Sequence, residues 1–305
     1  MYNKTMISKE IMGVRVDFGL TMKEVLNLIE LYLKDNESRY ICTTNPEFIM
    51  DAQTDGRFKN IINKADLSVP DGAGVLMARK YLDRLKKIKR DTWFPVRAFF
   101  QGTLLGIFSI FKNRDKEEKI TGVDLTYKMC ELSAQKGYNV FFLGGRPKDF
   151  WGKHAEKYHK EMAVTTAEEL QKLYPGLKVV GATSKFSREE RDDKVTLDYI
   201  QECMKNVGVD HIDFLFVAYG APKQEKWIVR NSYKIPAKVS IGLGGTFDYI
   251  MGNCKLPPNI LVKMNLGWLY RLIKQPWRAR RIFTAFPSFP LKVYKDSVKN
   301  IYFKR

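Results

Sequence analysis

The chain has 305 residues, of which 45% are hydrophobic and 28% charged, a balance that is ordinary for a soluble globular protein. This composition excludes a wholly disordered chain, a collagen and a polytopic membrane protein. The 52 Lys and Arg against 34 Asp and Glu give a formal net charge of +18, which points to an acidic partner such as nucleic acid, anionic lipid or a phosphate-bearing substrate.

Six short apolar runs are bounded by turn residues and have the length of β-strands. They lie at residues 40–44, 66–69, 140–143, 178–182, 212–218 and 239–243. Between them, apolar residues recur with helical spacing, most clearly over 22–33, 123–136 and 188–206. Because strands that alternate with helices are typical of parallel βαβ units, we expect an α/β fold with a mostly parallel sheet flanked by helices.

The positive charge is concentrated in two segments. Residues 84–119 carry a net charge of +6 and residues 255–305 a net charge of +11, so the remaining 218 residues are nearly neutral. We therefore expect a neutral core over residues 1–254, interrupted by an insertion at 84–118, and a basic C-terminal appendage at 255–305. No recognised nucleic-acid-binding motif accompanies the basic residues, so we expect no nucleic-acid partner.

Both basic segments are also apolar and aromatic. The first contains the sequence WFPVRAFFQGTLLGIFSIF at 93–111, whose longest stretch without a charge has 14 residues. A helix that crosses a bilayer needs roughly 20 apolar residues. Basic residues beside aromatic ones are typical of proteins that bind anionic membrane surfaces, so we expect a helix or hairpin that dips into the lipid interface. The alternatives are a buried core helix with a packed helical cap, or a groove for a partner protein.

Glycines and polar residues follow five of the six predicted strands. In an open α/β sheet, ligands bind just beyond the carboxyl ends of the strands, so these residues are expected to lie together. Two of the turns contain paired glycines, Gly144-Gly145 and Gly244-Gly245, whose backbone amides suit a phosphate group. Tight turns alone would explain the same glycines.

Asp71 is the carboxylate that stands out among these residues. It lies between Pro70 and Gly72, directly after the second predicted strand. A partly desolvated carboxylate in this position can act as a general base. The alternative is that Asp71 caps the helix that begins near Gly72. Asp248, which follows the last strand, has the same two interpretations, as a helix cap or as a ligand contact.

Several classes of protein are not favoured. The four cysteines and three histidines have no metal-binding spacing, so we expect no metal site and the reduced thiols of a cytosolic protein. The first 18 residues contain no apolar core of a secretory signal, which argues against export. No G-x-G-x-x-G with an acidic residue about 20 positions later is present, which argues against a nicotinamide-dependent oxidoreductase. We expect no cofactor.

A series of motifs over about residues 10–285 resembles the WecG/TagA/CpsF glycosyltransferases, in the order that this family shows. The matching elements are Thr43-Thr44-Asn45-Pro46-Glu47, Pro70-Asp71-Gly72-x-Gly74, Thr121-Gly122-Val123-Asp124-Leu125, Gly144-Gly145-Arg146-Pro147, Gly220-Ala221-Pro222-Lys223-Gln224-Glu225, Gly242-x-Gly244-Gly245-x-Phe247-Asp248, Trp268-Leu269-Tyr270-Arg271 and Pro276-x-Arg278-x-x-Arg281. The resemblance implies a Rossmann-like core and a metal-independent, inverting sugar transfer. The usual donor is a UDP-N-acetylmannosamine-type sugar, and the usual acceptor is polyprenyl-diphosphate-linked N-acetylglucosamine of bacterial cell-surface polysaccharide or teichoic acid synthesis.

The same resemblance implies roles for individual residues. Asp71 corresponds to the base that deprotonates the acceptor hydroxyl. Three C-terminal residues, Arg271, Arg278 and Arg281, correspond to arginines that close over the site and contact the diphosphates. The remaining expected substrate-binding residues are Thr43, Asn45, Lys119, Gly144, Gly145, Gln224, Gly244 and Asp248. Lys119 stands where the family usually has Arg, so the charge is kept while the bidentate fork is lost.

Together these patterns predict a peripheral membrane enzyme at the cytoplasmic face of the plasma membrane. Its expected partners are a UDP-sugar, a polyprenyl-diphosphate-linked acceptor and an anionic membrane surface, and a homo-oligomer is an open alternative to a monomer. Another UDP-hexose donor or another lipid-linked acceptor would fit the same motifs. A non-catalytic lipid-binding or nucleic-acid-binding relative is the alternative from a different class, against which the intact Asp71 and Gln224 argue.

Overall fold

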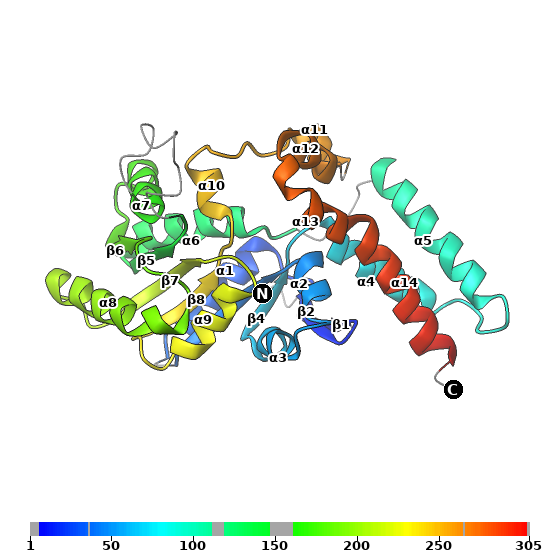
Figure 1. Cartoon of the computed structure of the whole chain (residues 1–305), viewed down its shortest axis with the longest axis horizontal. Coiled ribbons are helices and arrows are strands. Elements are labelled where there is room, and N and C mark those ends of the chain that lie inside the picture. The colour runs from blue at the N-terminus through cyan, green and yellow to red at the C-terminus, as the bar shows by residue number, and fades with distance from the viewer. Residues whose placement is uncertain (1–5, 36, 112–118, 147–160, 265, 304–305) are drawn as a thin grey trace.

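The computed structural model describes residues 6–35, 37–111, 119–146, 161–264 and 266–303. Its centre is a six-stranded sheet in which all neighbouring strands are parallel (Figure 1). In spatial order the strands are β4 (Leu67–Pro70), β3 (Arg39–Thr44), β8 (Ala237–Gly242), β7 (Ile212–Ala218), β5 (Asn139–Gly144) and β6 (Lys178–Thr183). Each predicted strand is present, so the α/β class with a mostly parallel sheet is confirmed.

Helices cover both faces of the sheet, which agrees with the nearly continuous apolar strands. The helices that pack on the sheet include α1 (Met22–Tyr32), α6 (Gly122–Lys136), α7 (Met162–Leu173), α8 (Asp193–Val207) and α9 (Lys223–Asn231). Successive side chains of a strand point to opposite faces. Phe142 and Phe216 accordingly join the core under α1, α6 and α7, whereas Phe141 and Leu215 join the core under α8 and α9.

An antiparallel hairpin that the sequence analysis did not predict precedes the sheet. Its strands β1 (Ile7–Ile11) and β2 (Val14–Phe18) are joined by Met12-Gly13, where both residues have positive φ, 51° and 74°. Positive φ at both central positions matches the twist of hairpin strands. Most of β1 is polar or exposed, so its hydrophobic pattern gives little strand signal.

The inserted segment and the end of the chain share one core with this hairpin. That core includes side chains of α2 (Pro46–Asp51), α3 (Gly56–Lys64), α4 (Ala73–Leu85), α5 (Phe94–Phe111) and α14 (Phe289–Ser297). Phe94 and Ala98 of α5 are fully buried, and Phe289 and Val293 of α14 are at most 2% exposed. The segment 255–305, expected as an appendage, therefore ends in a helix that completes a core begun at the N-terminus.

Four short helices lead from the sheet to α14. They are α10 (Thr246–Ile250), α11 (Asn259–Lys263), α12 (Gly267–Lys274) and α13 (Ala279–Phe283). Figure 1 shows them beyond the sheet, on the way to the paired helices α5 and α14. Among the described residues, no helix combines the length and the apolar character that a membrane span requires.

The strand order marks where a ligand binds. After β3 the chain forms β4, at one edge of the sheet. The later strands β5 to β8 all lie on the other side of β3, where β8 is its neighbour, so the direction of the strand order reverses next to β3. Open α/β sheets bind ligands at such a reversal, beyond the carboxyl ends of the strands. The residues that follow β3, β4, β7 and β8 are therefore the ones to examine.

Candidate active site

Asp71 lies directly after β4 and is held beside the end of β3. Its backbone N–H donates to the carbonyl oxygen of Thr44 at 2.9 Å. Burial raises the pKa of the Asp71 carboxyl to about 6, although the positive charges of Lys119 and Arg271 act in the opposite direction. Helix α4 has Gly72 as its N-cap and no side-chain capping bond, so the structure does not use Asp71 as a cap. The carboxylate is thus partly desolvated and faces two cations.

The second feature is the start of α6, which follows Lys119. Surrounding protein atoms lower the pKa of Lys119 even though its side chain reaches solvent, while the Asp71 charge opposes this shift. A side-chain carbon built on Gly122, the first residue of α6, would lie 3.5 Å from Thr246 Oγ1 and 3.8 Å from Thr43 Oγ1. The positive end of the α6 dipole therefore lies beside two hydroxyls at the carboxyl ends of β3 and β8.

Two C-terminal arginines flank a single aromatic ring. The guanidinium carbons of Arg271 and Arg278 lie 5.9 Å and 5.7 Å from the centre of the Tyr249 ring. Arg278 Nη1 also donates to the Tyr249 hydroxyl at 3.2 Å. The buried Arg271 Nε has no hydrogen-bond partner within the described ranges. The charge of Arg271 also acts on Asp71 and Lys119, so this arginine belongs to the same charged cluster.

Asp248 is a buried carboxylate on α10 with a cationic partner. Its Oδ2 lies 3.5 Å from Arg146 Nη2, and its side chain is 8% exposed. The N-cap of α10 is Gly245, and that helix has no side-chain capping bond, so Asp248 is not its cap. A side-chain carbon on Gly245 would lie 3.2 Å from Arg278 Nη2 and 3.8 Å from Asp248 Oδ2. Arg278 and Asp248 thus both lie next to Gly245.

The site therefore combines a carboxylate with a raised pKa, a lysine and two arginines around a glycine turn and a helix N-terminus. The model of the WecG/TagA/CpsF glycosyl transferase family matches residues 9–94 and 98–301 of the chain. The chain belongs to this family. It is a glycosyltransferase, and the resemblance inferred from its motifs is confirmed.

Curated relatives are similar over nearly their whole length. A protein of Bacillus spizizenii named N-acetylglucosaminyldiphosphoundecaprenol N-acetyl-beta-D-mannosaminyltransferase is 28% identical over 280 residues, which are 92% of this chain and 88% of the relative. A protein of the same name from Bacillus subtilis is 26% identical over 87% of this chain and 82% of the relative. A third protein of this name, from Staphylococcus aureus strain MRSA252, is 24% identical over 95% of this chain and 93% of the relative.

In this glycosyltransferase Gln224 joins two loops. Its Oε1 accepts from the backbone N–H of Gly220 at 2.9 Å and of Gly244 at 2.8 Å, and its Nε2 donates to Glu225 Oε1 at 2.7 Å. The side chain is 1% exposed. The Gly244 amide, expected to bind phosphate, is thus already paired. Gln224 positions the turn under Arg278, and its expected contact with substrate stays a prediction.

Burial also affects the neighbour of Gln224. Glu225 is buried, and its pKa is raised to about 7, while the hydrogen bond from Gln224 acts in the opposite direction. Its Oε2 has no partner in the described part of the chain. This carboxyl is therefore close to half-protonated at neutral pH. Its hydrogen bond with Gln224 helps to hold the two loops.

The Gly144-Gly145 turn is shaped by close contacts with the β7 end. Both glycines have positive φ, 89° and 88°, and the Gly145 amide donates to the Ala218 carbonyl at 2.9 Å. That amide is therefore paired within the protein. Residues 147–160, which follow this turn, are outside the described residues.

Replacing Gly144 by Ala should lower the free energy of unfolding by about 2–4 kcal/mol. The new Cβ would have a positive φ and would lie 2.8 Å from Tyr219 Cδ1 and 3.2 Å from the Ala218 carbonyl carbon. Urea unfolding of the two proteins measures the difference. Gly56→Ala is the matched control, because Gly56 is helical and has no atom within 4 Å of its added Cβ, so its stability should stay within about 1 kcal/mol. Equal stability of the two variants would contradict the prediction.

Two further expected residues have partners within the protein. Arg281 Nε donates to Glu47 Oε2 at 2.6 Å, which joins α13 to α2, and its side chain is 58% exposed. Asn45 caps α2, since its Oδ1 accepts from the Phe48 amide at 3.0 Å. Their expected roles in substrate binding stay predictions, and in the structure both order the segment that follows β3.

Sequence reasoning missed Tyr249 and Arg146. Tyr249 follows Asp248 in a matched motif, yet a tyrosine at that place gives no sign of contact with arginines about 20 and 30 residues away. Arg146 follows Gly144-Gly145 directly, and that position was the available signal. A charged residue after a glycine turn at a strand end is placed to face the same ligand.

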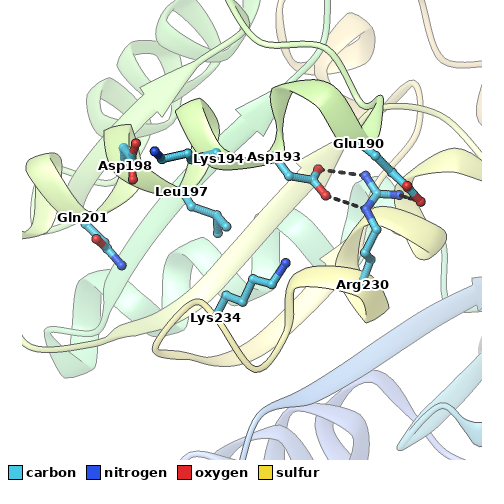
Figure 2. A pocket seen from close by; sticks show the side chains of 8 residues that line it. All are labelled: Glu190, Asp193, Lys194, Leu197, Asp198, Gln201, Arg230 and Lys234. Atoms are coloured by element: carbon cyan, nitrogen blue, oxygen red, sulfur yellow. Dashed lines mark hydrogen bonds and ion pairs between the residues drawn. The ribbon is translucent and has the colours of Figure 1, made fainter.

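A surface hollow of about 570 Å³ lies elsewhere, between α8 and the end of α9 (Figure 2). Arg230 in this hollow donates to both carboxylate oxygens of Asp193, at 2.5 Å and 2.8 Å. The lining has as many carboxylates (Glu190, Asp193 and Asp198) as cations (Lys194, Arg230 and Lys234), so the hollow has no excess of positive charge that would favour an anion. The described residues also contain no group of three or more His, Cys, Asp or Glu placed to hold a metal ion.

Proposed function

We propose that this glycosyltransferase moves N-acetylmannosamine from a UDP-sugar to N-acetylglucosamine linked to a polyprenyl diphosphate. The named relatives support this choice of sugar and acceptor. The observation that carries it is the pairing of a desolvated base, Asp71, with two cations, Lys119 and Arg271, whose charges act on it. An alcohol nucleophile requires a base that accepts its proton. A nucleoside diphosphate leaving group requires cations that stabilise its growing negative charge.

The base acts on the acceptor. Above pH 6 the Asp71 carboxylate is ionised, and it accepts the proton of the acceptor hydroxyl as that oxygen bonds to the anomeric carbon of the donor. The bond from this carbon to the UDP oxygen breaks at the same time. A single displacement from the opposite side inverts the anomeric configuration.

The cations act on the leaving group. Negative charge grows on the diphosphate of UDP as its bond breaks, and Arg271 and Arg278 are the groups placed to meet it. The Arg271 Nε donor is unpaired within the described residues, and Arg278 is held over the Gly244-Gly245 turn by Tyr249. The N-terminal end of α6 adds a fixed positive potential.

We also propose that the enzyme is attached peripherally to the cytoplasmic face of the membrane. A polyprenyl chain lies in the bilayer, so its head group meets a water-soluble UDP-sugar only at the surface. The net charges of +6 and +11 on the two basic segments attract the enzyme to anionic lipid.

A transfer assay tests the proposed reaction. Purified protein is mixed with polyprenyl-diphosphate-N-acetylglucosamine in detergent and with each of several UDP-sugars. We expect UDP-N-acetylmannosamine to be consumed with formation of one disaccharide-lipid of inverted configuration. If product formed only with another UDP-hexose, that sugar would be the donor and the proposed one would be wrong. Absence of product with every donor would contradict the proposed acceptor or the proposed catalysis.

A further inference from the structure

Helix α5 is largely apolar around its circumference but buried on only one side, and its one charged residue, Arg97, is paired with Asp91. Phe94, Ala98 and Leu105, spaced by four and seven residues, pack into the core, and a side-chain carbon on Gly102 would touch the Tyr81 ring of α4 at 3.3 Å. A helix that is hydrophobic all round is normally enclosed by protein or lipid. The described residues enclose only half of α5.

The opposite side of α5 exposes large apolar residues. We call this set of residues the exposed stripe, because each is 44% to 60% exposed: Val96, Phe99, Phe100, Leu104, Ile107 and Phe108. They recur at helical spacing, so they form one continuous strip along α5. Trp93, just before the helix, is 66% exposed. Contiguous exposed apolar surface of this kind marks an interaction site.

Exposed lysines border the stripe. Lys86, Lys87 and Lys89 lie exposed in the connection that enters α5. Lys295 in α14 and Lys299 in the π-helix η5 (Val298–Phe303) are exposed as well. Helix α14 packs beside α5 through a Phe99–Tyr294 ring contact with centroids 5.8 Å apart (Figure 1). Positive charge next to an apolar aromatic strip is complementary to an anionic lipid surface.

We propose that α5 lies in the plane of the membrane interface, with the exposed stripe in the acyl boundary and the neighbouring lysines on anionic head groups. The 18 residues of α5 give a strip about 27 Å long. The helix is rigidly held, because its buried side shares a core with α4 and α14. The inserted segment, residues 84–118, begins in the last turn of α4, a helix that starts two residues after Asp71, and Lys119 follows it directly in the sequence. Docking of α5 therefore keeps the part of the enzyme that carries Asp71 at the membrane surface.

A lipid surface fits these observations better than a second copy of the chain. The bordering residues of α5 and α14 are positively charged, so two copies face to face would bring like charges together. The inference rests on the proposed function only for the place of the acceptor. Vesicle binding is measured without substrate, so a failure here is distinct from a failure of transfer in detergent.

The test is co-sedimentation of the full chain with phosphatidylcholine vesicles, with and without phosphatidylglycerol. The double variant Phe100→Ser, Leu104→Ser should bind the anionic vesicles at least about tenfold more weakly, because two large side chains no longer enter the lipid. The matched control is Val195→Ser, Val207→Ser, which changes two residues that are 49% and 55% exposed on α8, at the far end of the molecule from α5 (Figure 1). The control should bind as the wild type does.

Charge is tested separately with Lys87→Glu, Lys89→Glu. This variant should lose binding to the anionic vesicles and keep the weak binding to neutral ones. Transfer in detergent to a short-chain acceptor should be unchanged in every variant, which shows that each folds. Equal binding by wild type and the Phe100, Leu104 variant would overturn the proposal. A wild-type dimer that this variant converts to a monomer, with no vesicle binding by either, would assign the stripe to a second copy.

Discussion

Replacing Asp71 by Asn should reduce kcat for sugar transfer by about 10²–10⁴-fold. Asn has nearly the same shape but cannot accept the proton of the acceptor hydroxyl. The measurement is the steady-state rate with UDP-N-acetylmannosamine and the lipid-linked acceptor. The KM of the donor should change much less than kcat, because Asp71 acts on the acceptor.

The same residue should set the acid side of the pH profile. Because burial raises the pKa of Asp71 to about 6, kcat/KM of the wild type should fall about tenfold per pH unit below 6 and be level above it. The residual kcat/KM of Asp71→Asn should not fall in this way below pH 6.

Asp71→Asn should also stabilise the fold. The pKa of about 6 in the folded protein lies above the ordinary value of 3.8, so the unfolded chain gives up this proton more readily. Stability from this group is present below pH 3.8 and is lost as the pH rises through 6. At pH 7 the ionised carboxylate costs on the order of 2–3 kcal/mol, which Asn removes.

The control for these experiments is Asp83→Asn on α4, where the carboxylate forms a half-exposed surface pair with Lys9. Its rate and pH profile should match those of the wild type. A low rate together with a raised melting temperature separates loss of the base from loss of the fold. Normal activity of Asp71→Asn would remove Asp71 from the mechanism.

Replacing Arg271 by Ala should lower kcat by about 10²–10³-fold, because the growing charge on the UDP diphosphate then loses an oriented donor. Arg271→Lys should recover only part of this loss, since an ammonium lacks the planar fork that contacts two phosphate oxygens. The rates are measured in detergent at saturating donor, so that membrane attachment does not enter the result.

Arg280→Ala is the matched control for Arg271→Ala. Arg280 lies on the same C-terminal segment and is exposed, and its removal changes the net charge equally. Its rate in detergent should stay within about twofold of the wild type. Equal losses in the two variants would mean that the charge of the segment, rather than the position of Arg271, matters for transfer.

Much of the sheet could be predicted because its signals are local. Runs such as VFFL at 140–143 and FLFVA at 214–218 are apolar on both sides, and each lies within an observed strand. The β1–β2 hairpin could not be predicted in this way. Its first strand is polar, and Met12-Gly13 is a turn whose first residue gives no glycine or asparagine signal.

The sequence could predict candidate residues of the site but not their partners. Strand-end positions pointed to Asp71 and the family resemblance to Arg271 and Arg278, and the roles of these residues stay predictions. Pairings that join distant segments could not be predicted, such as Arg278 with Tyr249 or Gln224 with the Gly244 amide. These contacts depend on how loops pack after the sheet has formed, and single-sequence patterns do not encode that packing.

The core shared by the two ends of the chain has a consequence for biosynthesis. Phe289 and Val293 are translated after β2 and α5, yet they belong to the same core. Until α14 is synthesised, the nascent chain carries the largely apolar α5 without this neighbour. Domains generally fold as units during synthesis, N-terminal parts first. The core that holds α5 therefore stays incomplete during synthesis until α14 has left the ribosome.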